Sequence, residues 1–80
     1  MKNHTRLFAT GDKVRIEQID GSQDRKDFFG KYIGKEGQII SWNYLRREGY
    51  KYKVMFDKDN NDWQHFRQNE LILVGVDNKN

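Results

Sequence analysis

The chain has 80 residues, and its 15 Lys and Arg against 12 Asp and Glu give it a formal net charge of +3. A chain of this length forms one domain and buries only about 60% of the surface that it exposes when unfolded. It contains no cysteine, which excludes disulfides, thiolate metal sites and thiol nucleophiles. No apolar run is long enough for a signal peptide or a membrane span, so we expect a cytoplasmic protein without a membrane partner.

Composition divides the chain into a flexible N-terminal arm, a folded domain and a polar C-terminal tail, over residues 1–9, 10–75 and 76–80. The first strand is expected over 12–18, where Val14 and Ile16 alternate with charged residues. Residues 18–28 carry both charges without a periodic pattern, which predicts a long loop.

Four further strands follow, and the clearest of them alternates aromatic and apolar residues with polar ones over 50–56. The others are expected over 38–42, 63–66 and 71–74, with a short 3₁₀ turn at 68–70 before the last strand. These five short strands, without a helix-length amphipathic pattern, predict an all-β chain that forms a small antiparallel barrel. The side chains expected in its core are Val14, Ile16, Ile39, Val54, Phe56, Phe66 and Leu71.

Three glycines precede the second strand at spacings of four and three residues: Gly30, Gly34 and Gly37. Glycine adopts positive φ without a steric cost, so this spacing predicts a tight turn. Together with the strand opening 11–16, the glycines resemble the KOW motif of SH3-like barrels that touch RNA. The resemblance implies an SH3-like barrel whose loop binds nucleic acid, with Lys31 and Lys35 at the phosphates. The alternative is that the glycines only permit the turn that such a barrel needs.

Other cations and aromatic residues extend this predicted binding surface. Lys13 and Arg15 add positive charge near the loop, and further candidates are Tyr44, Arg46, Arg47 and Trp63. Tyr44 and Trp63 lie in or near turns, where an aromatic ring can stack on a base or on a partner's side chain. Packing at the ends of the barrel is the alternative for each ring.

Neither metal binding nor acid–base chemistry is indicated by the polar residues. The segment that begins at Asp57 imitates the start of a calcium loop, but its sixth and twelfth positions are Asp62 and Gln68 instead of glycine and glutamate. The two histidines, His4 and His65, have no nearby cysteine or second ordered histidine to complete a metal site. We therefore expect no metal, no cofactor and no catalytic residue.

A second resemblance concerns the C-terminal half. Tyr52–Phe56 followed by Trp63, and above all Phe66–Leu71, are similar to the SH3-like ferredoxin-docking subunit of photosynthetic NDH complexes. That family binds an acidic electron-transfer protein and has no catalysis of its own. The resemblance implies a protein-docking accessory subunit with an acidic protein partner.

A third resemblance is to the type II dihydrofolate reductases, which are SH3-like barrels that tetramerise around a pore for NADPH and dihydrofolate. It rests on three segments: 8–15, 37–42 and 48–50. The family's Val-Gln-Ile-Tyr motif falls on Trp63–Phe66, where only Gln64 matches, and its pore lysine falls on Ile16. The main interpretation is therefore a non-catalytic module that binds nucleic acid, with protein docking and the reductase as alternatives.

Overall fold

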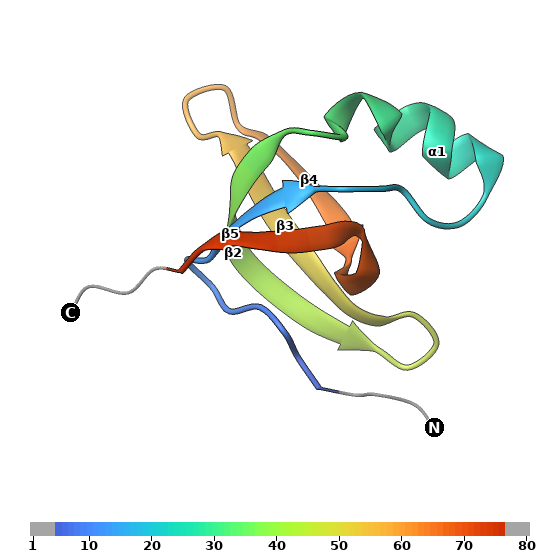
Figure 1. Cartoon of the computed structure of the whole chain (residues 1–80), viewed down its shortest axis with the longest axis horizontal. Helices are drawn as coiled ribbons and strands as arrows, with labels where there is room; N and C mark the ends of the chain where they lie inside the picture. Colours follow the sequence, from blue (N-terminus) through green and yellow to red (C-terminus); the bar gives the residue numbers. More distant parts are fainter. Residues whose placement is uncertain (1–4, 77–80) are drawn as a thin grey trace.

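The computed structural model describes residues 5–76 as an SH3-like barrel of five antiparallel strands (Figure 1). The strands are β1 (Lys13–Ile16), β2 (Glu36–Leu45), β3 (Gly49–Asp57), β4 (Asp62–Arg67) and β5 (Leu71–Gly75). They lie in the order β4-β3-β2-β1-β5, and the 3₁₀ turn η2 (Gln68–Glu70) precedes β5. The predicted all-β class, the strands and the closing turn are confirmed. Parts of the predicted arm and tail, with His4, lie outside the described residues.

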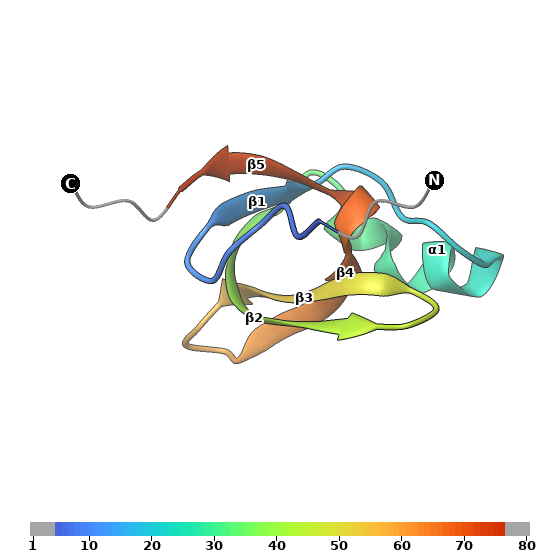
Figure 2. The same ribbon diagram turned by 90° about the horizontal axis from the view of Figure 1, so that it is seen from below.

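Bulges curl the sheet into a barrel. The pairing register of β2 with β3 shifts between Ile39 and Ser41, and that of β3 with β4 shifts between Met55 and Asp57. A bulge bends its strand and increases the local twist. Because of this curvature, β1 and β5 form one layer over β2, β3 and β4 (Figure 2).

The core lies between these two layers. Six of the seven predicted core residues are buried, and Phe56 is partly buried against them. Within residues 5–76, the other buried hydrophobic side chains are Phe8, Ile19, Tyr32 and Tyr52. Tyr32 packs on Phe56 with ring centroids 4.8 Å apart and on Phe66 at 5.8 Å. The segment between β1 and β2 therefore contributes to the core.

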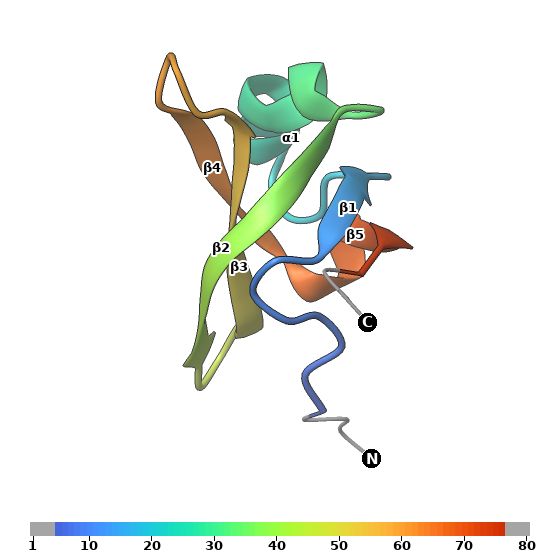
Figure 3. The same ribbon diagram turned by 90° about the vertical axis from the view of Figure 1, so that its left-hand side faces the viewer.

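The prediction of a long loop over 18–28 is wrong, because this segment contains the helix α1 (Gln23–Phe29), which protrudes from the side of the barrel (Figures 1 and 3). Ser22 caps it, since its hydroxyl oxygen accepts a hydrogen bond from Arg25 N at 3.2 Å. The helix runs into a single 3₁₀ turn, η1 (Gly30–Tyr32). Seven residues are too few to display a helical period in the sequence.

A buried carboxylate, Glu70, joins the α1 segment to the closing turn. It accepts hydrogen bonds from Asp20 N and Arg67 N, both at 2.7 Å, and forms an ion pair with Arg25. The Glu70 side chain is completely buried and that of Arg25 is 14% exposed. The long connection after β1 is therefore fixed to η2.

Of the three predicted turn glycines, Gly34 alone has the positive φ that favours glycine. Gly34 has φ +90°, whereas Gly30 lies in the α region with φ −57° at the end of α1. Gly37 is buried inside β2, and a Cβ atom there would lie 2.6 Å from Val54 Cγ1 and 2.7 Å from Met55 O. Gly30 thus lies in the turn η1 without needing to be glycine, whereas the turn prediction is wrong for Gly37, which serves close packing.

Replacing Gly37 with alanine should lower the free energy of unfolding by about 1–3 kcal/mol, because the added methyl group overpacks the contact between β2 and β3. Gly30→Ala is the matched control, since nothing lies within 4 Å of the position that its methyl group would take and its φ is ordinary for alanine. Urea denaturation of both variants measures the difference. Equal stabilities would show that Gly37 is not required for packing.

Candidate functional site

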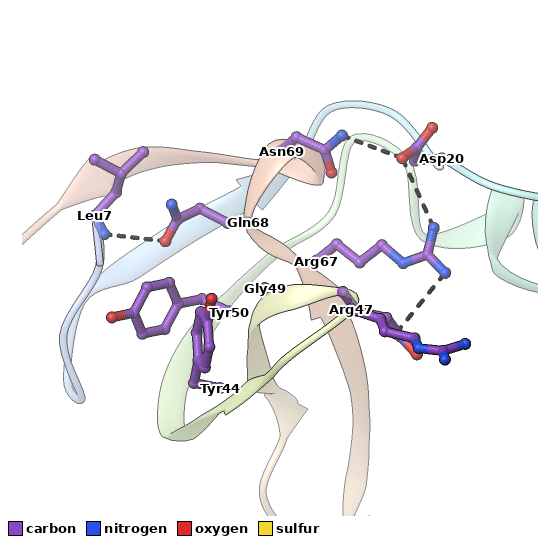
Figure 4. Close-up of a pocket in the computed structure, with 10 residues that line it drawn as sticks. Leu7, Asp20, Tyr44, Arg47, Gly49, Tyr50, Arg67, Gln68 and Asn69 are labelled. Carbon is purple, nitrogen blue, oxygen red and sulfur yellow. Dashed lines mark hydrogen bonds and ion pairs between the residues drawn. The ribbon is translucent and has the colours of Figure 1, made fainter. Parts of the chain in front are cut away.

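A cleft of about 460 Å³ opens between the β2–β3 turn and η2 (Figure 4). Tyr44, Arg47 and Tyr50 line it from the β2–β3 hairpin, and Arg67 at the end of β4 and Gln68 of η2 line it from the other side. Aromatic rings thus face polar side chains across the opening, a composition found in protein-binding surfaces.

An ionic network forms the polar wall of the cleft. The guanidinium group of Arg67 lies 3.7 Å from Asp20 and 3.9 Å from Glu48, and Lys51 Nζ lies 3.2 Å from Glu48. A hydrogen bond from Asn69 is the largest cause of a lowered pKa at Asp20. The hydrogen bond from Lys51 similarly lowers the pKa of Glu48. Both carboxyl groups are therefore ionised at neutral pH, which keeps Arg67 in position.

Aromatic rings form a row on the hairpin side of the cleft. Tyr44 lies edge-to-face on Tyr50 with ring centroids 4.8 Å apart, and Trp42 also meets Tyr50 edge-to-face at 5.7 Å. The guanidinium group of Arg6 covers Trp42 at 4.3 Å from the ring centroid. Tyr44 and Trp42 remain 41% and 40% exposed, so the row presents aromatic surface to solvent.

The described part of the N-terminal arm lies against Gln68. The Gln68 side-chain amide accepts a hydrogen bond from Leu7 N and donates one to Thr5 O, each at 3.0 Å. Phe8 inserts into the core, where its ring meets that of Tyr52 edge-to-face at 5.3 Å. The arm therefore forms one wall of the cleft through Leu7.

A second surface, which we call the β3–β4 face, lies on the outer side of these two strands and comprises Lys51, Lys53, Met55, Trp63 and His65. In the pairing register Lys53 lies opposite His65 and Met55 opposite Trp63. Lys53 Nζ lies 3.9 Å from the Trp63 ring centroid, and the His65 ring lies 5.4 Å from that of Trp63. Cations and an aromatic ring are thus combined on one partly exposed face.

The cations of the predicted KOW-like loop have partners of their own. Lys31 and Lys35 lie over the Tyr32 ring at 5.6 and 5.7 Å from its centroid. Arg15 is paired with Glu17 at 2.9 Å and with Glu36 at 3.6 Å. The pairing neutralises part of the positive charge expected to face phosphate, although both lysines remain exposed.

The other predicted site residues do not form one patch. Lys13 lies on β1 beside a shallow pocket next to Val74, and Trp63 belongs to the β3–β4 face. Tyr44 and Arg47 line the cleft, and Arg46 lies exposed in the β2–β3 turn. The prediction missed several cleft and face residues, namely Asp20, Glu48, His65 and Gln68. The alternation of Lys51 and Lys53 with core residues was the sequence signal for that face.

The segment that imitates a calcium loop is an ordinary turn. Asp57 accepts hydrogen bonds from Asp59 N at 3.1 Å and Asn60 N at 3.3 Å, as an aspartate does in a strand-connecting turn. Within residues 5–76 no cluster of three or more His, Cys, Asp or Glu is arranged to hold a metal ion. In the same part of the chain, no helix has both the length and the apolar character needed to cross a membrane.

His65 should make the stability of the folded chain depend on pH. Burial, followed by the charges of Lys51 and Lys53, lowers the pKa of His65 below its usual 6.5. The unfolded chain then binds the proton more tightly than the folded chain. The contribution of His65 to the free energy of unfolding is therefore complete above the pKa that His65 has in the unfolded chain, and it is lost as the pH falls through the lower pKa of the folded chain. Urea denaturation should show that the free energy of unfolding falls more between about pH 7.5 and about pH 5.5 for the parent chain than for His65→Gln. The same loss in both would exclude His65 as the cause.

The strand order, the helix in the first long connection and the 3₁₀ turn before the last strand define the class of protein: a small SH3-like barrel. Among solved structures, the chain is similar to the cyanobacterial cytochrome b6f complex subunit PetP, determined in solution. The TM-score is 0.65 at 25% identity, and the match covers 91% of this chain and 95% of PetP. No family model matches the sequence, and no curated protein matches it significantly.

Proposed function

We propose that this chain is a non-catalytic accessory subunit that docks onto another protein. The observation that carries the proposal is the similarity to PetP, which is a subunit of a protein complex and matches over nearly the full length of both chains. A complex of the cytochrome b6f kind is therefore the first candidate for the partner.

The surface chemistry supports docking to a protein. The cleft combines exposed Tyr44 with the charged side chains of Arg47 and Glu48, and the β3–β4 face adds Trp63. Tyr, Trp and Arg are the residues that contribute most often to the binding energy of protein interfaces. The nucleic-acid interpretation has less support, because Arg15 is paired with two carboxylates and the loop cations do not join the other candidates in one patch.

Co-purification tests the proposal. The tagged full-length chain, expressed in cells of its own organism, should recover a defined protein complex in a fixed ratio from detergent extracts. Nuclease treatment and moderate salt should leave the recovery unchanged, because uncharged contacts supply much of the contact area in protein interfaces. Recovery that nuclease abolishes, together with salt-sensitive binding to oligonucleotides, would instead support nucleic acid as the partner.

A further inference from the structure

We infer that the β3–β4 face is a docking site for an acidic patch on a partner protein, and that His65 takes up a proton when the patch binds. The inference rests on the proposed docking function and specifies the surface, the chemistry of the partner and its dependence on pH.

The geometry directs these side chains outward. Tyr52 and Val54 alternate with Lys51, Lys53 and Met55 along β3, and both are fully buried. On β4 the buried residue is Phe66, next to exposed His65. The face therefore consists of side chains that the barrel does not use for its core.

The positive charge of the face is only partly neutralised. Lys51 is paired with Glu48, which Arg67 also approaches. Among residues 5–76, no carboxylate oxygen lies within 4.0 Å of a side-chain nitrogen of Lys53 or His65, so neither residue forms an ion pair there. Lys53 instead lies over the Trp63 ring, where the attraction between the cation and the ring still leaves the charge open to a partner carboxylate.

The surroundings of His65 make proton uptake responsive to an acidic partner. Lys51 and Lys53 face it from β3, while Trp63 and Arg67 flank it on β4 and Ser41 lies beyond Lys53 on β2. Arg67 is directed to Asp20 and Glu48. Burial and the two lysines disfavour the protonated ring. A partner carboxylate would oppose the lysine charges and favour protonation.

The distribution of charge favours a compact acidic patch over a nucleic-acid backbone. Carboxylates lie at both ends of the face. Glu48 lies at the β2–β3 turn, and Asp57 lies opposite Asp62 next to the turn that connects β3 to β4. A phosphate chain that followed the strands would meet these carboxylates. A protein surface with a few acidic groups and an apolar contact for Trp63 and Met55 avoids them.

The test uses the 80-residue chain with His4→Gln, so that His65 is the one histidine left in it. The probe is poly-L-aspartate, whose carboxylates stay ionised over the range used. The His65 ring is titrated by NMR with and without the probe, and affinity is measured at about pH 5.5 and about pH 7.5. We expect the probe to raise the pKa of His65, with binding about fivefold tighter at the lower pH.

Three variants locate the effect. His65→Gln should abolish the pH dependence of binding and retain the affinity seen at the higher pH. Lys53→Glu should weaken binding by about tenfold. Lys58→Glu makes the same charge change in the exposed β3–β4 turn and should have a much smaller effect. NMR spectra confirm that each variant is folded.

Specific outcomes would overturn the inference. Binding that leaves the pKa of His65 unchanged would exclude proton uptake, and equal effects of Lys53→Glu and Lys58→Glu would exclude the face. If a single-stranded oligonucleotide bound more tightly than poly-L-aspartate at the same salt concentration, the partner of this face would be nucleic acid and not an acidic protein patch. Failed co-purification with intact probe binding would contradict only the accessory-subunit proposal.

Discussion

Replacing Glu70 with glutamine should lower the free energy of unfolding by about 3 kcal/mol. The substitution leaves the guanidinium group of Arg25 without its counter-ion in a largely buried position. It also weakens the acceptor for the backbone N–H groups of Asp20 and Arg67. A small domain has a total stability of only about 5–15 kcal/mol, so the loss should be obvious in urea denaturation.

Glu17→Gln is the matched control, because it removes the same charge from an exposed ion pair with Arg15. Exposed pairs contribute about 0–1 kcal/mol, so this variant should remain close to the parent chain. If Glu70→Gln were no less stable than Glu17→Gln, the buried pair would not stabilise the connection between α1 and η2.

The second large effect is expected at Phe66. Its side chain is fully buried, and its ring meets those of Phe29, Tyr32 and Phe56 at centroid distances of 5.7, 5.8 and 5.9 Å. Phe66→Ala opens a cavity among these aromatic rings and should lower the free energy of unfolding by about 3–5 kcal/mol. Thermal unfolding followed by circular dichroism should show a greatly reduced Tm or a chain that does not fold.

Phe28→Ala controls for the loss of an aromatic residue. Phe28 is 56% exposed and contacts Phe29 from the solvent side, with ring centroids 4.8 Å apart. Its removal should lower the free energy of unfolding by about 1 kcal/mol or less. A Phe28→Ala variant as unstable as Phe66→Ala would show that α1 carries more of the packing than burial indicates.

The strands were predictable because one face of each is buried. Val14 and Ile16 on β1, and Tyr52 and Val54 on β3, repeat at the period of two that a half-buried strand requires. The boundaries were less accurate: β1 ends at Ile16 and β2 extends to Leu45. The hairpin that β2 forms with β3 projects beyond the buried region, so the outer part of β2 carries its alternating rings, Trp42 and Tyr44, on an exposed face and not in the core.

The α1 segment could not be predicted from periodicity. It is attached by the packing of Phe29 on Phe66 and by the ion pair between Arg25 and Glu70, which are 45 residues apart in the sequence. Polar side chains with distant partners leave no local pattern, and α1 itself contains no buried residue. The local signs of a helix were the cap at Ser22, the acidic Asp24 in the first turn and the basic Lys26 in the last turn.

The candidate site was predictable by residue type and not by arrangement. Tyr44, Arg47 and Trp63 were identified as exposed candidates, but they belong to two different surfaces. Which rings and charges share a surface depends on the pairing register and on the fold of the α1 segment. The contribution of Gln68 depends on its contact with Leu7, which is 61 residues away.

The buried carboxylate of Glu70 also constrains the order of folding. Its bonds to Arg25 and to Asp20 N close loops of 45 and 50 residues, so these contacts cannot form until the segment after β4 is in place. Closing long loops is slow compared with forming a hairpin such as β2–β3. If these contacts form after the transition state, weakening them accelerates unfolding and leaves the folding rate almost unchanged. The kinetic lifetime of the barrel would then depend on Glu70.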